Sequence, residues 1–323
     1  MNSTYGRSPE AIFAAREDPA RRDINLVAKR IAGELETARP KMEKFIGLKK
    51  GGYERPSYSR DAVNNDLRKV ATQTAQFKDA HEKEVHAEAE ALEKILFYFL
   101  EQNNWLGENA RTIPTTRYDD YMNGIDSIIE WNRAGKSAAY LAIDFTVTET
   151  PQIVEKKIER ALQELEKGTL ARIKYFESES APRGPLKVVP RVLIGVRRNA
   201  LKDYASSAID FFEKKTGSAK KIAEHPISRD IFDQVYLQLD FYAKRLREII
   251  KEKDASSKKT LESKKEEGGP ARADAHKRAL LNVLRALQEL EPVRRKLSEK
   301  ATFEPSRFTE ILSSRLVKSS VAA

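Results

Sequence analysis

The stretch that decides the fold runs from Tyr140 to Thr148 and reads YLAIDFTVT. As a β-strand, it places Leu, Ile, Phe and Val at every second position, on one face. The opposite face carries Asp144 between Ala142 and Thr146, so a carboxylate lies among small and hydroxyl side chains. A charged group on an otherwise apolar strand needs a partner, which makes Asp144 the first candidate for chemistry.

A second acid occupies a similar position in residues 124–131, GIDSIIEW, where Asp126 shares a face with Ile128 and Glu130. If residues 132–138 join the two runs as a hairpin, the faces bearing Asp126 and Asp144 coincide. Two carboxylates within about 4–6 Å repel each other unless a cation lies between them, and Mg²⁺ is a cation that carboxylates hold. Alternatively, either aspartate caps a turn or accepts backbone hydrogen bonds.

The composition limits the classes of protein to which this chain can belong. The chain has 323 residues, no cysteine and a net charge of +10. Disulfides, thiolate metal sites and cysteine catalysis are therefore excluded. The basic excess favours a polyanionic partner, with nucleic acid before a membrane surface. The first residues lack the apolar core of a signal peptide, and no run approaches the roughly 20 apolar residues that span a bilayer. We expect a cytoplasmic protein without a membrane partner.

Apolar periodicity sets the order of elements. It predicts a loop over 47–65 and helices over 24–46 (interrupted at Pro40), 66–102, 151–167, 200–215, 228–253 and 275–300. It predicts β-rich runs over 111–120, 124–131, 138–148 and 187–196. A helix between two strands requires a crossover, so the sheet is expected to be at least partly parallel.

The expected organisation has four parts. Residues 1–79 form a helical N-terminal extension and residues 80–216 form the core. Residues 217–312 form a C-terminal helical region with a polar linker at 254–274, and 313–323 form a frayed tail. The two long C-terminal helices could fold back as a hairpin and serve as a homodimer interface.

The order α-β-β-β-α-β over residues 80–215 resembles the PD-(D/E)XK nuclease superfamily. Asp126 takes the place of the first acid, and Asp144-Phe145-Thr146 takes the place of the acid-x-lysine triplet. The resemblance implies an α/β fold with a small mixed sheet in a restriction-endonuclease-like core, flanked by helical extensions. It also implies a Mg²⁺- or Mn²⁺-dependent nuclease that hydrolyses phosphodiester bonds, with DNA favoured over RNA.

The chain departs from the family pattern at the lysine. Thr146 stands there and cannot supply a positive charge. Lys156 and Lys157 on the following helix are the expected replacements, which makes Asp126, Asp144, Thr146, Lys156 and Lys157 the catalytic candidates. Alternatively, both lysines form ordinary ion pairs on a solvated helix face. The missing lysine motivates a second hypothesis, in which an inactive nuclease-fold protein binds nucleic acid or a protein partner through its helical arms.

The resemblance implies that Asp126 and Asp144 bind the metal, and that a glutamate of the upstream helix joins them. Glu88 lies on the apolar side of that helix, either as a ligand or as an edge residue, whereas Glu90 and Glu93 are expected to point outward. A second register remains open, with Asp119 or Asp120 as the first acid and Glu130-Trp131-Asn132 as the triplet.

Basic residues flank the last strand of the predicted core. Such groups contact phosphates and add salt-dependent affinity, or they are ordinary surface charges. The predicted nucleic-acid contacts are Lys174, Arg183, Lys187, Arg191, Arg197 and Arg198.

Overall fold

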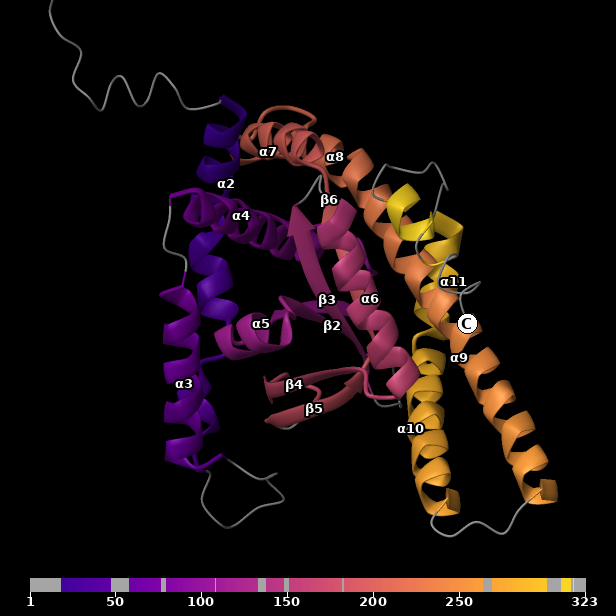
Figure 1. The fold of residues 1–323 in the computed structure, drawn as a ribbon. Coiled ribbons are helices and arrows are strands. Elements are labelled where there is room, and N and C mark those ends of the chain that lie inside the picture. Colours follow the sequence, from indigo (N-terminus) through magenta and orange to yellow (C-terminus); the bar gives the residue numbers. More distant parts are fainter. Residues whose placement is uncertain are drawn as a thin grey trace, which may run out of the picture.

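The computed structural model describes residues 19–47, 58–76, 80–107, 109–132, 138–147, 151–181, 183–263, 269–300, 309–314 and 316. The centre is a four-stranded sheet in the order β1-β2-β3-β6 (Figure 1). Its strands are β1 (Ala110–Pro114), β2 (Ser127–Trp131), β3 (Ala139–Val147) and β6 (Arg191–Val196). The first three strands pair antiparallel, whereas β3 and β6 are parallel. The expected small mixed sheet is therefore confirmed.

The parallel pair depends on the helix that crosses over the sheet, α6 (Pro151–Lys167). Pro151 is its first residue, a position where the missing N–H costs nothing. Val154, Ile158, Leu162 and Leu165 are buried along one side of it. This apolar stripe holds α6 against β6, and it fixes where the polar side of the helix lies relative to β3.

The two faces of the sheet are covered differently. Helix α4 (Ala80–Gln102) covers the face of Leu141 and Ile143, because its Leu92 and Leu96 belong to the same apolar core. The opposite face packs Ile128 and Ala142 against a second, two-stranded sheet, β4 (Ala171–Phe176) and β5 (Gly184–Val189). Asp144 lies on this second face.

The run 187–196, expected as one strand, divides at Pro190. Residues up to Val189 pair with β4, and residues from Arg191 pair with β3. Proline has no N–H to donate to a strand ladder, so the chain changes sheets there. The expectation of one continuous strand was wrong for this reason.

A short helix replaces the end of the first expected β run. Helix α5 (Arg117–Asn123) begins after Thr116, whose hydroxyl accepts a hydrogen bond from the Asp119 N–H. It ends at Gly124, which has a φ of 61°, in the left-handed region that glycine tolerates. This turn carries the chain directly into Asp126 and β2.

The N-terminal region consists of α2 (Pro19–Ala38), a short 3₁₀ helix η1 (Met42–Phe45) and α3 (Arg60–Thr74). Helix α3 begins within the expected loop 47–65, because the Ser59 side chain caps it. Helix α2 packs against α4, and its Ile24, Val27 and Ile31 belong to the core shared with the sheet.

The C-terminal region contains α7 (Arg198–Phe212), α8 (Ser218–Ala223), α9 (Pro226–Ser263), α10 (Gly269–Glu289) and α11 (Glu291–Lys300). Figure 1 shows α9 and α10 side by side as a hairpin. Much of the expected linker 254–274 is thus helical, while residues 264–268 lie outside the described part. The helix expected over 275–300 breaks before Pro292, which cannot donate a backbone hydrogen bond within a helix.

The two C-terminal helices that were expected to serve as a homodimer interface bury apolar residues within the chain. Leu280 and Leu287 are buried in the shared core. Leu316, in the segment expected to fray, is buried there as well, while residues 317–323 lie outside the described part. Among the described helices, none combines the length and apolarity that crossing a bilayer requires.

The outer edge of β6 is closed by two glutamines of α9, one turn apart. Gln234 accepts a hydrogen bond from the Gly195 N–H (2.7 Å) and donates to the Gly195 carbonyl (2.9 Å). Gln238 does the same with Leu193, at 2.9 and 2.8 Å. Both side-chain amides are buried, so they replace the neighbouring strand that this edge lacks.

We expect Gln238→Leu to destabilise the fold by about 2 kcal/mol or more, since it leaves a buried N–H and a buried carbonyl of Leu193 unpaired. Urea unfolding measures the change. Gln163→Leu on the exposed side of α6 is the matched control, expected within about 0.5 kcal/mol of the unsubstituted protein. Equal stability of the two variants would show that α9 does not close the sheet in this way.

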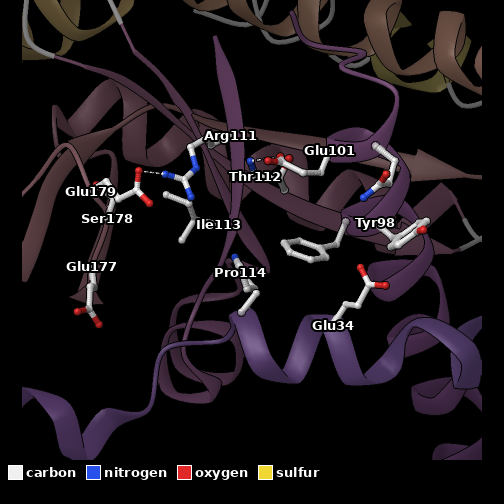
Figure 2. A pocket seen from close by; sticks show the side chains of 13 residues that line it. Glu34, Tyr98, Glu101, Arg111, Thr112, Ile113, Pro114, Glu177, Ser178 and Glu179 are labelled. Atoms are coloured by element: carbon white, nitrogen blue, oxygen red, sulfur yellow. Dashed lines mark hydrogen bonds and ion pairs between the residues drawn. The ribbon is translucent and has the colours of Figure 1, made fainter. Parts of the chain in front are cut away.

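The opposite edge, β1, is also closed. The Thr112 N–H donates to Glu101 Oε2 (2.7 Å), the Ala110 N–H donates to the Gly107 carbonyl (2.9 Å), and Pro114 has no N–H. A cavity of about 500 Å³ lies beside this edge, and Figure 2 shows Arg111 there in an ion pair with Glu179. Among the predicted residues whose side chains the structure describes, none of those assigned to catalysis, metal binding or nucleic-acid contact lines this cavity.

Candidate functional site

Asp126 and Asp144 come close together where β2 begins beside β3. Asp126 precedes Ser127, the first residue of β2, and it is hydrogen-bonded to Ile143 and Phe145, the residues on either side of Asp144. The charge of Asp144 acts on the Asp126 carboxylate. The structure therefore brings together the two acids that the sequence singled out.

Asp126 is held by both neighbouring strands. Its N–H donates to the Ile143 carbonyl (2.9 Å), and its carbonyl accepts from the Thr115 N–H (3.0 Å). Its carboxylate Oδ2 accepts a hydrogen bond from the Phe145 N–H (2.6 Å). Part of the residue stays open to solvent, whereas Asp144 is 7% exposed. Asp126 thus combines a fixed position with an accessible surface.

Lys157 supplies the cation next to this pair. Its Nζ lies 2.6 Å from Asp144 Oδ1, and its side chain is 34% exposed. Lys156, the other predicted replacement, is exposed to solvent on α6. Thr146 is buried on β3. Of the two lysines considered, the geometry places Lys157 at the acids.

Burial and neighbouring negative charge act together on Asp126. Although part of the residue is accessible, the surrounding protein shields its carboxylate from water and raises its pKa well above the usual value for an aspartate, and the charge of Asp144 raises the pKa further. Asp120 and Glu93 contribute in the same direction, whereas Lys157 opposes them. Without a further cation, Asp126 therefore tends to keep its proton where an ordinary aspartate has lost it.

A second pair of carboxylates adjoins the first. Asp120 comes from α5 and Glu93 from α4, and Glu93 is 5% exposed. Burial and the charge of Glu93 raise the pKa of Asp120 to about 7, although Arg39 and Arg117 lower it. The Arg117 guanidinium lies 3.6 Å from Asp120. Burial lowers the pKa of Arg117, but the surrounding glutamates outweigh it and the pKa is raised overall.

Glu93 is the residue that sequence reasoning missed. It was expected to point outward, but α4 is buried on nearly every side because it lies between the sheet and α2. The side chain of Glu88, the predicted ligand, lies outside the described part of the chain. Glu90 pairs with Arg117 at 2.9 Å. The sequence feature that could have indicated a buried Glu93 is its position inside the long apolar run ALEKILFYFL, residues 91–100.

Asp119, the first acid of the alternative register, has a structural role. Its Oδ1 accepts hydrogen bonds from the Lys174 N–H and from the Asn123 amide, both at 2.7 Å. Its Oδ2 accepts from the Tyr175 N–H (3.0 Å). These bonds attach α5 to β4. Glu130, first residue of the alternative triplet, lies opposite Tyr140 rather than another acid.

The predicted nucleic-acid contacts separate into two groups. Lys174 is paired with Asp66 amid tyrosine rings, and Arg183 is paired with Glu177. Arg191 is 5% exposed and donates to the carbonyls of Asn123 and Gly124, which removes it from the surface where phosphates would bind. The group that remains exposed is Lys187, Arg197 and Arg198.

Arg160 is a further cation near the acids that the sequence did not single out. Its Nη2 donates to the Asn123 carbonyl (3.0 Å), beside the turn that leads to Asp126. It lies on α6 one turn after Lys156 and about half of its side chain is exposed. It can therefore meet a phosphate that approaches the acids.

Within the described ranges, no three histidine, aspartate or glutamate side chains gather closely enough to hold a metal ion alone. Glu93 is bound to Arg39, and the pair next to Lys157 consists of Asp126 and Asp144. Magnesium commonly takes one or two protein carboxylates and completes its shell with water and substrate oxygens. The Asp126–Asp144 pair fits that mode of binding.

No protein-family model, curated protein or solved structure was found to match this chain. A proposal about function therefore depends on the contacts that the acids of the site make with their neighbouring cations.

Proposed function

We propose that this protein is a metal-dependent nuclease that hydrolyses phosphodiester bonds in DNA. One observation supports the proposal most directly: Asp126 is hydrogen-bonded to the residues on either side of Asp144, while Lys157 reaches Asp144 from the crossover helix. A pair of acids with a cation beside them suits a reaction on a phosphate, which needs a divalent ion and compensation of negative charge.

The order of elements supports the same proposal. Helix α4 precedes β1, β2 and β3, and α6 leads from β3 to the parallel strand β6. Helix α5 between β1 and β2, and the β4–β5 hairpin between α6 and β6, are insertions relative to the α-β-β-β-α-β order expected for a restriction-endonuclease-like core.

In this proposal Asp126 and Asp144 hold Mg²⁺ or Mn²⁺. When bound, the ion would polarise the phosphate and lower the pKa of a coordinated water. Lys157 would take the role of the absent triplet lysine, donating a hydrogen bond to the phosphate as negative charge develops. Arg160 would bind a neighbouring phosphate of the same strand, with Lys187, Arg197 and Arg198 as outer contacts.

Incubation with Mg²⁺ or Mn²⁺ tests the proposal on supercoiled, linear duplex and single-stranded DNA and on RNA. We expect cleavage of at least one DNA form, and none with EDTA. If every substrate stays intact under both ions, the proposal is wrong. Persistent DNA binding that neither EDTA nor Asp144→Asn changes would instead favour the inactive nuclease-fold protein suggested by Thr146.

A pair of lysine variants tests the assignment on α6. We expect Lys157→Ala to lower the cleavage rate by about 100-fold or more, as removal of a preorganised charge donor does. Lys156→Ala is the matched control, since it removes an adjacent lysine that faces solvent, and its rate should stay within about threefold. Equal losses in both variants would assign Lys157 to general phosphate attraction instead. Cleavage kinetics at saturating Mg²⁺ distinguish the two results.

A further inference from the structure

Arg39 joins the N-terminal helix α2 to the acidic site. It directly follows α2 and is 6% exposed. One guanidinium nitrogen donates to the Thr115 carbonyl (2.6 Å), and the other donates to Glu93 Oε1. The first nitrogen also lies 3.9 Å from Asp120 Oδ2. The guanidinium therefore lies between the second pair of carboxylates.

These contacts hold the Arg39 guanidinium in one position and orientation. A buried charge is costly unless it is paired and hydrogen-bonded, and Glu93 is as buried as Arg39. The planar guanidinium can serve the Thr115 carbonyl and the Glu93 carboxylate at once, because its donors form a rigid fork. The Thr115 N–H, in turn, donates to Asp126. Arg39 is thus connected to Asp126 through a single residue.

Glu93 and Asp120, both in contact with Arg39, lie within electrostatic reach of Asp126 and raise its pKa. A second divalent ion beside the first would need them as ligands. With the guanidinium bound to Glu93, that carboxylate is already compensated.

We propose that Arg39 is a built-in cation that occupies the position a second divalent ion would take, so that the site binds one ion through Asp126 and Asp144. This inference rests on the proposed function, because it presumes that those aspartates bind a metal. It makes Arg39 a positioning residue that keeps Glu93 out of the metal's coordination shell. It also makes α2 part of the site, although the resemblance to nucleases begins only near residue 80.

The number of Mn²⁺ ions bound per full-length chain tests the inference, by titration calorimetry and by native mass spectrometry. We expect one ion for the unsubstituted protein and two for Arg39→Met, which frees Glu93 and Asp120. Arg39→Lys keeps the charge and should bind one ion. Arg117→Met is the matched control, since it also removes a guanidinium next to Asp120 but leaves Glu93 bound to Arg39. It should bind one ion.

Two ions on the unsubstituted protein would overturn the inference and leave the proposed function in place. One ion on a folded Arg39→Met variant would overturn it as well. No ion on the unsubstituted protein would remove both the inference and the proposed function. If Arg39→Met does not fold, Glu93→Gln gives a separate test. Binding of one ion with unchanged affinity would support the inference. Lost or weakened binding of that ion would contradict it.

Discussion

Asp144→Asn is expected to lower Mg²⁺-dependent DNA cleavage by about 100- to 1,000-fold or more, the size of effect seen when one electrostatic contact to a reacting centre is lost. The amide keeps the shape of the side chain but removes the negative charge that a hard cation requires. Lys157, one-third exposed, then lies next to a neutral group and can turn to solvent. Cleavage kinetics with a Mg²⁺ titration measure the loss.

Asp210→Asn is the matched control for this variant. Asp210 lies on α7 in ion pairs with Lys215 and Lys221, and it belongs to neither pair of carboxylates at the site. Its cleavage rate should equal that of the unsubstituted protein. A normal rate for Asp144→Asn, with normal dependence on Mg²⁺, would remove Asp144 from the site.

The second large effect is a pH dependence of stability that divalent ions reverse. The pKa of Asp120 is raised to about 7 and the pKa of Asp126 is raised as well, so the metal-free folded state binds more protons than the unfolded chain. Stability is therefore complete below the unfolded pKa of about 4, and it falls as the pH rises through about 7. Asp120 contributes to this change because burial and the charge of Glu93 raise its pKa.

Urea unfolding at pH 5, 6, 7 and 8 without metal measures this slope. We expect Asp120→Asn to reduce it, because an amide does not titrate. Asp210→Asn should not reduce it, since its lysine partners lower the pKa of Asp210 and the associated stability is lost only in acid. Stability that rises from pH 5 to pH 8 would contradict the charge arrangement of the site.

Metal binding should displace the same protons. Calorimetric titration with Mn²⁺ at pH 7, in buffers with different heats of ionisation, is expected to show proton release that Asp126→Asn diminishes. Binding without proton release would place the ion away from the buried acids.

The parts of this site that were predictable are local in sequence. The alternating face of β3, the apolar stripe of α6 and the position of Pro151 follow from side-chain periodicity within one element. The proximity of Asp126 and Asp144 required one further step, a short hairpin between neighbouring strands. The sequence offered Lys156 and Lys157 as equal candidates on the crossover helix, and the ion pair with Asp144 selects Lys157.

The parts that were missed depend on contacts between distant segments. Arg39 and Glu93 are 54 residues apart, and Gln234 and Gly195 are 39 apart. Periodicity assigned Glu93 to an outer face because it considers one exposed side per helix, whereas α2 covers that side of α4. Pro190 indicated that the run 187–196 could divide. The part before Pro190 pairs with β4, however, and apolar periodicity did not predict β4 as a strand.

The most direct test of the central claim is a crystal of the protein soaked in Mn²⁺, with data collected for anomalous scattering. We predict a peak bonded to one carboxylate oxygen of Asp126 and one of Asp144, with Lys157 displaced from its contact with Asp144 Oδ1. An ion held elsewhere at saturating Mn²⁺, with both aspartates still in their present hydrogen bonds, would contradict the account.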